Sequence, residues 1–471
     1  MLTYLAGQKN TPENTLSELL VQEIHRILVS VGTWWSTIIS LIVISVLAGF
    51  MSFSEQGHSS SNSLGFYIPL TYSVGLSMLI TAPLNGLLSN RLRDDLYQGN
   101  YNPVPNALSA ALTLLLPFVF ILTLLLHLCF SSRSFEQGLV FAALTASMST
   151  LWVCNNVMTL LQKDYEIIFT FFIGLFFAMT ISFFIKGEFG NEGLLSALTL
   201  GFTLTSFMQY GLMLKQYKKN HIIPCYDFVK LNKKDINVFL FLTLLNSGMW
   251  IDKILYWFAS NASGKLDNVD RMFRYSTYDY PFFVIFTLFS FSQFLILRKQ
   301  KELLKDPQQA FSNGLFFNLP FKNLDKEKKN LIFGYRKIMY TLFSVYGSIT
   351  LIILFSLYVG IFSLPWKNPF IFHILLISTL ILGVFFLNLI ILQYTDQYQP
   401  IAALCGLFFF LNTFGTFLTI SPFECLSFLN EYQGLGFLIA SLVTTVVSSI
   451  YVEQILGCWE YVVIKNIAND F

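Results

Sequence analysis

The sequence carries little charge. Asp, Glu, Lys and Arg make up 12% of its 471 residues, whereas a typical soluble domain carries about 25%. Hydrophobic residues make up 54%, and Phe alone occurs 50 times. A chain of this composition cannot cover its apolar side chains with polar ones in water. The sequence therefore excludes an ordinary soluble protein and predicts one built for a lipid bilayer.

Catalytic and metal-binding motifs are also scarce. The six cysteines are scattered without close pairs, which favours neither a disulfide framework nor a zinc site. No glycine-rich loop ends in Gly-Lys-Ser or Gly-Lys-Thr, so we expect no ATP hydrolysis by this chain. His127 and His373 lie in apolar runs, where a packed, hydrogen-bonded ring is favoured over an acyltransferase base. We predict a protein that is not an enzyme and that holds no cofactor or metal.

Long apolar runs dominate the chain. A helix needs about 20 apolar residues, with a range of about 17–25, to cross a hydrocarbon layer of about 30 Å. We place twelve such spans at residues 32–52, 64–89, 106–130, 138–161, 166–185, 193–214, 236–260, 280–297, 338–362, 370–394, 400–420 and 434–456. The predicted fold class is therefore all-α, a polytopic integral membrane protein with about twelve transmembrane helices.

The spacing of the spans suggests two six-helix halves around a central cavity, an arrangement common in transporters. The expected parts are an amphipathic N-terminal helix at the cytoplasmic surface (1–31), a first half (32–214), a basic loop (215–235), a second half (236–456) and a C-terminal tail (457–471). We find no residue-level repeat between the two halves in the sequence.

Lys and Arg gather in the connections of one side, above all in the 215–235 loop and in a long loop at 298–337. Because cytoplasmic loops carry an excess of Lys and Arg, we expect both termini in the cytoplasm. Two interpretations of the basic loops stay open. They lie against anionic lipid of the inner leaflet, or they form a docking platform for a cytoplasmic partner.

Two charges fall inside an apolar span. Asp252 and Lys253 lie a few residues past the middle of the 236–260 span, where an uncompensated charge costs at least about 2.5–3.5 kcal/mol. Neighbouring residues on a helix point about 100° apart, so we expect that the two side chains do not simply satisfy each other. They line a hydrophilic path, or they form a structural ion pair with neighbouring helices.

Polar side chains in other spans fit a conduit better than an active site, because each needs a partner inside the bilayer. Trp250, beside the charges, suits stacking against a sugar ring as well as membrane anchoring. The candidate path residues are Asp252, Lys253, Asn246, Trp250, Asn85, Asn155 and Asn156, with Gln209 as a further buried amide.

Two more groups flank this path. Mixed charge and tyrosines in the outer loop after the 236–260 span suit a hydroxyl-rich ligand, or equally an interfacial tyrosine belt. This outer-mouth group is Arg271, Arg274, Tyr275, Tyr278 and Asp279. A cytoplasmic gate or docking group follows the 64–89 span, and it consists of Arg91, Arg93, Asp94 and Asp95.

Three stretches, taken in order and with their spacing, resemble the Pel exopolysaccharide transporter (PelG) family of the multidrug/oligosaccharidyl-lipid/polysaccharide (MOP) exporter superfamily. They are Thr81-Ala82-Pro83-Leu84 leading to Asp94-Asp95-Leu96-Tyr97, then Trp250-Ile251-Asp252-Lys253 leading to Tyr256-Trp257, and Tyr278-Asp279-Tyr280-Pro281-Phe282. The spacing of the last four spans also fits, and the similarity covers nearly the whole chain. The family tends to place an arginine after the first of the two aspartates, where this chain has Asp95.

The resemblance implies a MATE/MOP-like bundle of two halves that rock about a central cavity. It implies an exporter in the bacterial inner membrane that passes an N-acetylgalactosamine-rich polymer outward, beside a cytoplasmic glycosyltransferase and other membrane subunits. The expected partners are thus the polysaccharide, the synthase complex and the lipid bilayer, with no nucleic acid. Alternatives are a flippase for lipid-linked oligosaccharides, an ion-coupled drug exporter, a non-transporting scaffold of the synthase, and an integral membrane transferase that uses His373.

Overall fold

The computed structural model describes the helices and some of the connections. The described residues are 59–97, 100–131, 133–161, 163–217, 224–226, 228, 232–259, 263–265, 274–276, 321–358, 369–395, 397–420 and 432–458. The predicted amphipathic helix at 1–31, the spans at 32–52 and 280–297, most of the long basic loop and nearly all of the C-terminal tail lie outside this set. The count of twelve spans therefore stays a prediction.

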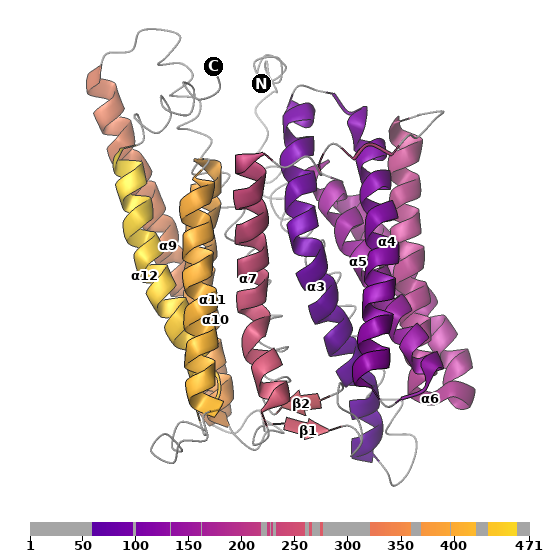
Figure 1. Cartoon of the computed structure of the whole chain (residues 1–471). Helices are drawn as coiled ribbons and strands as arrows, with labels where there is room; N and C mark the ends of the chain where they lie inside the picture. The colour runs from indigo at the N-terminus through magenta and orange to yellow at the C-terminus, as the bar shows by residue number, and fades with distance from the viewer. Residues whose placement is uncertain are drawn as a thin grey trace, which may run out of the picture. The chain divides into compact units, whose positions relative to one another are not determined.

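The chain divides into two compact units, each described here by itself. Unit 1 comprises Met1–Asn246 with Gly264–Tyr275, and unit 2 comprises Ser247–Ser263 with Ser276–Phe471. Figure 1 shows the elements of both. The division falls within one helix, α7 (Lys233–Phe258), so that its first part belongs to unit 1 and its last part to unit 2.

Unit 1 contains four further helices. They are α3 (Ser59–Tyr97), α4 (Pro103–Phe130), α5 (Phe135–Leu160) and α6 (Asp164–Tyr217). The 54 residues of α6 cover two predicted spans, and Gly190 interrupts the helix between them with φ +54° and ψ −130°. That left-handed φ suits glycine, which lacks the Cβ that would clash there. One glycine thus turns a continuous helical stretch into two spans.

Unit 2 contains α9 (Phe321–Tyr358), α10 (Pro369–Tyr394), α11 (Tyr398–Ile420) and α12 (Leu435–Gly457) besides its share of α7. Two three-residue strands, β1 (Ser263–Lys265) and β2 (Arg274–Ser276), pair in the loop after α7, and most of their residues belong to unit 1. The other regular elements of the described residues are helices, which confirms the all-α prediction. Every predicted span that falls on described residues lies on one of these helices.

Local sequence explains several helix ends. Pro103 and Pro105 stand in the first turn of α4, where a missing N–H costs nothing. Ser134 caps α5, its Oγ accepting from the Gln137 N–H at 3.3 Å. At the start of α7, Asn232 and Asp235 cap each other reciprocally, with the Asp235 N–H to Asn232 Oδ1 distance at 2.8 Å.

In unit 1, α5 packs against α3, α4 and α6. A hydrogen bond joins α5 to α3: the Trp152 indole Nε1–H donates to Ser77 Oγ at 3.1 Å. The two parts of α6 cross closely at Gly174 and Gly201. A Cβ on Gly201 would lie 2.7 Å from the carbonyl oxygen of Gly174. Small residues thus permit the close helix approach that drives packing in lipid.

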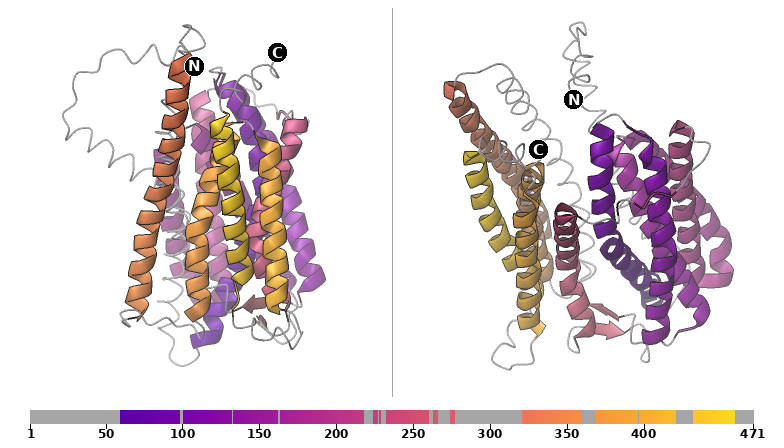
Figure 2. Two further views of the ribbon diagram at one scale, coloured as in Figure 1. Left: turned by 90° about the vertical axis from the view of Figure 1, so that its left-hand side faces the viewer. Right: turned by 45° about the horizontal axis from the view of Figure 1, so that its top comes forward.

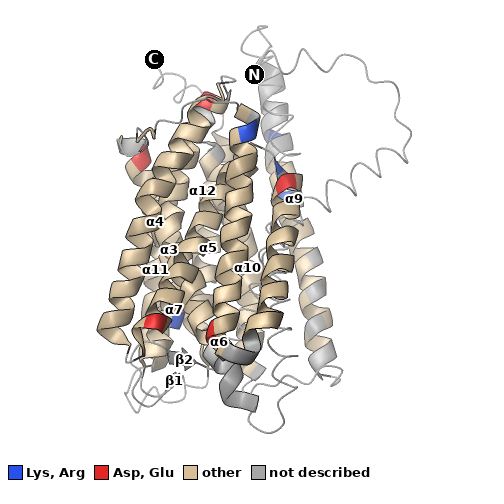
Figure 3. Ribbon diagram, turned by 90° about the vertical axis from the view of Figure 1, so that its right-hand side faces the viewer, with Lys and Arg blue, Asp and Glu red and all other residues tan. Residues whose placement is uncertain are grey.

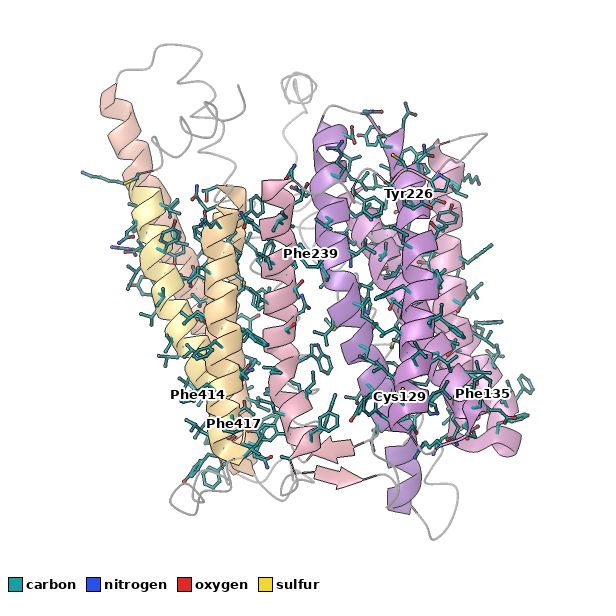
Figure 4. All side chains as sticks on the ribbon, in the orientation of Figure 1. Cys129, Phe135, Tyr226, Phe239, Phe414 and Phe417 are labelled. Carbon is teal, nitrogen blue, oxygen red and sulfur yellow. The ribbon has the colours of Figure 1, made fainter. Side chains whose placement is uncertain are left out.

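In unit 2, α12 packs against α9, α10 and α11, and the second views show it beside its neighbours (Figure 2). Its close crossing with α11 lies at Gly415 and Gly436, where a Cβ on Gly436 would stand 2.4 Å from the Thr416 backbone nitrogen. Large apolar side chains cover the outer faces of the helices. Phe414 and Phe417 of α11 are both more than half exposed, as suits lipid contact (Figure 4).

Eight segments of the described chain are long and apolar enough to cross a membrane. They are Pro103–Phe130, Phe135–Leu160, Tyr165–Ile185, Phe189–Lys215, Asp235–Phe258, Phe370–Gln393, Tyr398–Ile420 and Leu435–Gly457. The chain is therefore a multi-pass membrane protein. The remaining two, α3 and α9, are the longest uninterrupted helices, at 39 and 38 residues, and each exceeds the roughly 20 residues that a span needs.

Candidate functional site

The helices of the described chain are nearly free of charged residues, and most of those present lie near helix ends (Figure 3). Asp252 and Lys253 stand out because they lie inside the apolar segment of α7 and are buried. Their exposed fractions are 0% and 1%. A buried ionisable group inside a span is a functional candidate by default.

The two charges bind each other, which corrects the expectation that they would not. Lys253 Nζ lies 2.7 Å from Asp252 Oδ1, and the Lys253 backbone N–H donates to the same oxygen at 3.0 Å. The expectation considered only the directions in which the two Cβ atoms leave the helix. The four methylenes of lysine let the ammonium turn back toward the helix, where it also donates to the Met249 carbonyl oxygen.

Aromatic rings surround the lysine. Its ammonium lies 5.8 Å from the centre of the Trp250 ring and 5.2 Å from that of Phe437 on α12, both within the range of a cation–π contact. Trp250 is itself buried. The Lys253 ammonium is thus held within unit 2 by the Asp252 carboxylate, the Met249 carbonyl and two aromatic ring faces.

Hydrogen bonds fix the part of α7 that carries the doublet. The Tyr256 hydroxyl pairs with Thr419 Oγ1 of α11 at 2.9 Å and accepts from the Gly434 N–H, ahead of α12, at 3.0 Å. One turn before the doublet, Asn412 of α11 donates to the Gly248 carbonyl at 2.8 Å. Sequence reasoning missed Asn412, although a lone amide inside a span was the signal that it used elsewhere.

Asn246, the last residue of unit 1 on α7, donates to its own helix at the Leu242 carbonyl, 2.9 Å away. Near the start of α7, Asp235 Oδ1 accepts from the Asn90 side chain of α3 at 2.7 Å. Leu242 of α7 packs closely over Gly86 of α3.

The other predicted path residues form two clusters in unit 1. Asn156 of α5 donates to the Asn85 carbonyl at 3.2 Å and to Ser89 Oγ at 2.8 Å, both on α3. Asn155 accepts from Gln209 of α6 at 2.8 Å. The structure thus brings Asn85 together with Asn156, and Asn155 together with Gln209, within one unit.

A further polar network in unit 2 was not predicted. Asn388 of α10 accepts from the Tyr335 hydroxyl of α9 at 2.8 Å and donates to Ser448 and Ser449 of α12 at 2.8 and 2.9 Å. Tyr335, Asn388 and Ser448 are buried. In the sequence this network is visible only as one amide and two serines in apolar spans, and such residues also occur at ordinary helix–helix contacts.

The structure describes only part of the outer-mouth group and of the cytoplasmic gate or docking group. Arg274 and Tyr275 belong to β2, and Arg271, Tyr278 and Asp279 lie outside the described residues. At the end of α3, Arg91 is exposed and Asp95 is partly exposed. The side chains of Arg93 and Asp94 are also outside the described set.

The two histidines fit the packing interpretation. His127 is buried, its Nε2 lies 3.2 Å from the Ser134 carbonyl oxygen, and its ring packs against Phe141. It also fills the space over Gly138, where a Cβ would stand 2.5 Å from the ring. His373 meets the Phe370 ring edge to face at 6.3 Å.

Three solved structures that share the fold of this chain are transporters. The chain is similar to an outward-facing multidrug resistance MATE family transporter of the MOP superfamily, at a TM-score of 0.59 and 14% identity, with 92% of this chain and 96% of that one covered. It is similar to a MOP superfamily transporter from Pyrococcus furiosus at 0.54 and 15%, with the same coverage. It is also similar to MATE in the bent conformation at 0.58 and 11%, with 93% and 95% covered.

These likenesses confirm the predicted MATE/MOP-like fold. No curated protein matches the sequence significantly. A family model does match, over residues 8–463, and it is the PelG model, described as "Putative exopolysaccharide Exporter (EPS-E)". This range includes both units almost entirely. The chain therefore belongs to the PelG family of exopolysaccharide exporters.

Proposed function

We propose that this protein exports a Pel-like, N-acetylgalactosamine-rich polysaccharide across the bacterial inner membrane, beside the cytoplasmic glycosyltransferase that makes the polymer. Membership of the PelG family and the transporter fold support export. The observation that carries the role of this chain is the buried Asp252–Lys253 doublet on α7.

Stability does not explain the doublet well. Burying two charges costs several kcal/mol per ion, and apolar residues of similar volume often replace a buried pair without loss of stability. A doublet inside a span therefore suggests a ligand that uses it. A sugar chain offers hydroxyl groups that donate to a carboxylate and accept from an ammonium, together with ring faces that stack on indole. Asp252, Lys253 and Trp250 supply those three partners.

The proposed topology has both termini in the cytoplasm, because most Lys and Arg then lie on the inner side. The basic loops at 215–235 and 298–337 then face the synthase. The described start of α9 supports this arrangement. Its 38 residues outrun a span, and its first turns carry Lys322, Lys326, Lys328 and Lys329.

The test replaces each charge in cells that produce the polymer. Asp252→Asn and Lys253→Met should each lower secreted polymer at least tenfold while the protein still accumulates in the membrane. Arg336→Gln and Glu453→Gln are matched controls. They break the ion pair between α9 and α12, at 2.9 Å, and should leave secretion unchanged. Normal secretion by both doublet variants would contradict a path through α7.

A second experiment separates the exporter from its alternatives. Purification from membranes should bring down a glycosyltransferase with the chain. A scaffold would also retain the enzyme, but Asp252→Asn would then leave secretion intact. A drug exporter or a flippase for lipid-linked sugars would come without the enzyme, and drug efflux or lipid-linked sugar transport would then depend on the doublet.

A further inference from the structure

The outward face of α9 carries cations and aromatic rings near one end of the helix. On the opposite face Tyr335, Ile338 and Leu342, each one helical turn from the next, are buried, and α9 packs against α10 and α12. The outward face is open, because Phe333 is 71% exposed and Tyr340 is 73% exposed. These are the two most exposed aromatic side chains among the described residues of α9.

Two lysines share this face with the rings. Lys329 and Lys337 are both exposed. Since successive residues on a helix turn by about 100°, Lys329, Phe333, Lys337 and Tyr340 lie within an arc of about 80°. Within the part of the chain that the structure describes, neither ammonium forms a hydrogen bond or an ion pair. The face therefore presents two positive charges outward.

Contacts with the neighbouring helices fix the depth of this face. Tyr335 donates to Asn388 of α10, and Arg336 pairs with Glu453 of α12. Both partners lie in the last two turns of segments long and apolar enough to cross a membrane. Lys337 is therefore level with the end of the hydrocarbon layer. Lys329 lies about 12 Å farther along the axis, where α9 continues beyond the end of α12 (Figure 1).

The order of the side chains along the helix indicates what covers them. An exposed phenylalanine ring such as that of Phe333 favours acyl chains over water. Lys337 lies about 6 Å deeper along the axis than this ring. A cation at that depth is unfavourable unless its side chain reaches the interface and meets an anion there. Tyr340, with an apolar ring and a polar hydroxyl, suits the same boundary.

We propose that the face formed by Lys329, Phe333, Lys337 and Tyr340 binds an anionic phospholipid. The long lysine side chains let both ammonium groups reach one phosphate that lies between them, with charge-assisted hydrogen bonds. The acyl chains then run along the same side of α9. Farther along the helix that side is apolar, because Leu351 is 67% exposed and Phe355 is 65% exposed.

An acidic cytoplasmic protein fits this face less well than a lipid does. It would have to displace acyl chains from Phe333 and Tyr340 at the level where the spans end. The turns of α9 before Lys329 lie farther from the membrane and stay available to the synthase. The basic end of α9 is thus divided between lipid and cytoplasm. That the lipid belongs to the inner leaflet rests on the proposed topology.

The test measures lipid binding to the purified full-length protein by native mass spectrometry, in separate titrations of phosphatidylglycerol and phosphatidylcholine. Phosphatidylglycerol should bind about 25-fold more tightly, because attraction between anionic lipid and a nearby lysine contributes about fivefold per residue. Glycerol 3-phosphate offers the phosphate without acyl chains and should not compete at the same concentration. Equal binding of the two lipids, or displacement of the lipid by glycerol 3-phosphate, would overturn the proposal.

Variants assign the preference to α9. The double variant Lys329→Gln/Lys337→Gln changes two exposed side chains, so it should fold normally and lose the preference for phosphatidylglycerol. The matched control, Lys163→Gln/Lys215→Gln, removes the same charge from unit 1 and should keep it. A preference that survives in the α9 double variant would overturn the proposal. If that variant instead lost the glycosyltransferase on purification, the face would belong to the synthase. Polymer secretion is not the readout, so failure of the export proposal would leave this result unaffected.

Discussion

Units 1 and 2 differ in how fully they pair the buried polar side chains between their helices. In each, an asparagine near the C-terminal end of one helix, Asn155 of α5 or Asn388 of α10, binds a polar residue on a later helix of the same unit. In unit 2 the network closes on Tyr335, whereas in unit 1 an acceptor stays open on Gln209. The comparison shows that an architectural position is repeated while its chemistry is not. A network in which every buried polar atom is paired stabilises more than one that leaves a buried acceptor unpaired.

The largest effect is expected where two backbones touch. Gly436→Ala places a Cβ 2.4 Å from the Thr416 nitrogen and 2.7 Å from the Gly415 carbonyl carbon. Backbone atoms cannot rotate away, so α11 and α12 must separate. We expect a loss of at least about 3 kcal/mol, seen as little monodisperse protein in size-exclusion chromatography. Gly211→Ala, with nothing within 4 Å of the new Cβ, is the control and should be neutral or stabilising.

The corresponding crossing in unit 1 tests whether the two units depend equally on glycine. Gly201→Ala meets the Gly174 carbonyl oxygen and the Ala178 Cβ, both at 2.7 Å. Because these contacts are slightly longer, the two parts of α6 need to move less. The melting midpoint should fall, by less than for Gly436→Ala. An equal or larger fall would show that unit 1 is packed as tightly as unit 2.

The next effect sharpens the contrast between the closed and the open network. Asn388→Leu removes three hydrogen bonds, including the one in which Asn388 accepts from the buried Tyr335 hydroxyl, and a buried polar group left unpaired costs about 1–3 kcal/mol. Gln209→Leu removes an unpaired buried oxygen as well as two hydrogen bonds, so its cost in stability should be smaller. Melting midpoints of the two variants, measured side by side in one buffer, decide the order. A reversed order would mean that unit 1 is the better satisfied of the two.

The smallest effect is expected at the surface of unit 2. Arg336 and Glu453 form a bidentate pair, at 2.9 and 3.1 Å, but both side chains are largely in contact with solvent. Such pairs contribute little to stability and are screened by salt. The melting midpoint of Arg336→Gln should match that of the unmodified protein at high salt. A clear drop that persists there would assign this pair a structural role comparable to that of Asn388.

Much of the fold could be predicted from the sequence. The apolar runs locate helices well, since a buried or lipid-facing helix cannot tolerate many charges. The break in α6 was visible only as a gap between two runs, because the φ of Gly190 depends on the helices that it joins. The doublet could be located but not its pairing, since the pairing depends on how a flexible lysine side chain bends.

The polar networks were the hardest part to predict. Asn155 and Asn156 are neighbours in sequence, yet they bind different helices, α6 and α3 respectively. Which of the two meets Gln209 depends on the rotation of α5 about its axis, and no pattern in a hydrophobic run determines that rotation. Asn388 was missed for the same reason, because its importance comes from three partners on two other helices.

The hydroxyl of Tyr256 provides a natural reporter. Since the Gly434 amide proton is bonded to it, that proton can exchange with deuterated solvent only when the end of α7 moves away from α12. Its exchange rate, measured by mass spectrometry of peptides digested after the folded protein has been labelled, would therefore report how often the end of α7 separates from Gly434. A transport cycle that displaces α7 should speed the exchange. A Tyr256→Phe variant, which lacks the hydroxyl, would give the exchange rate of the Gly434 amide without this hydrogen bond.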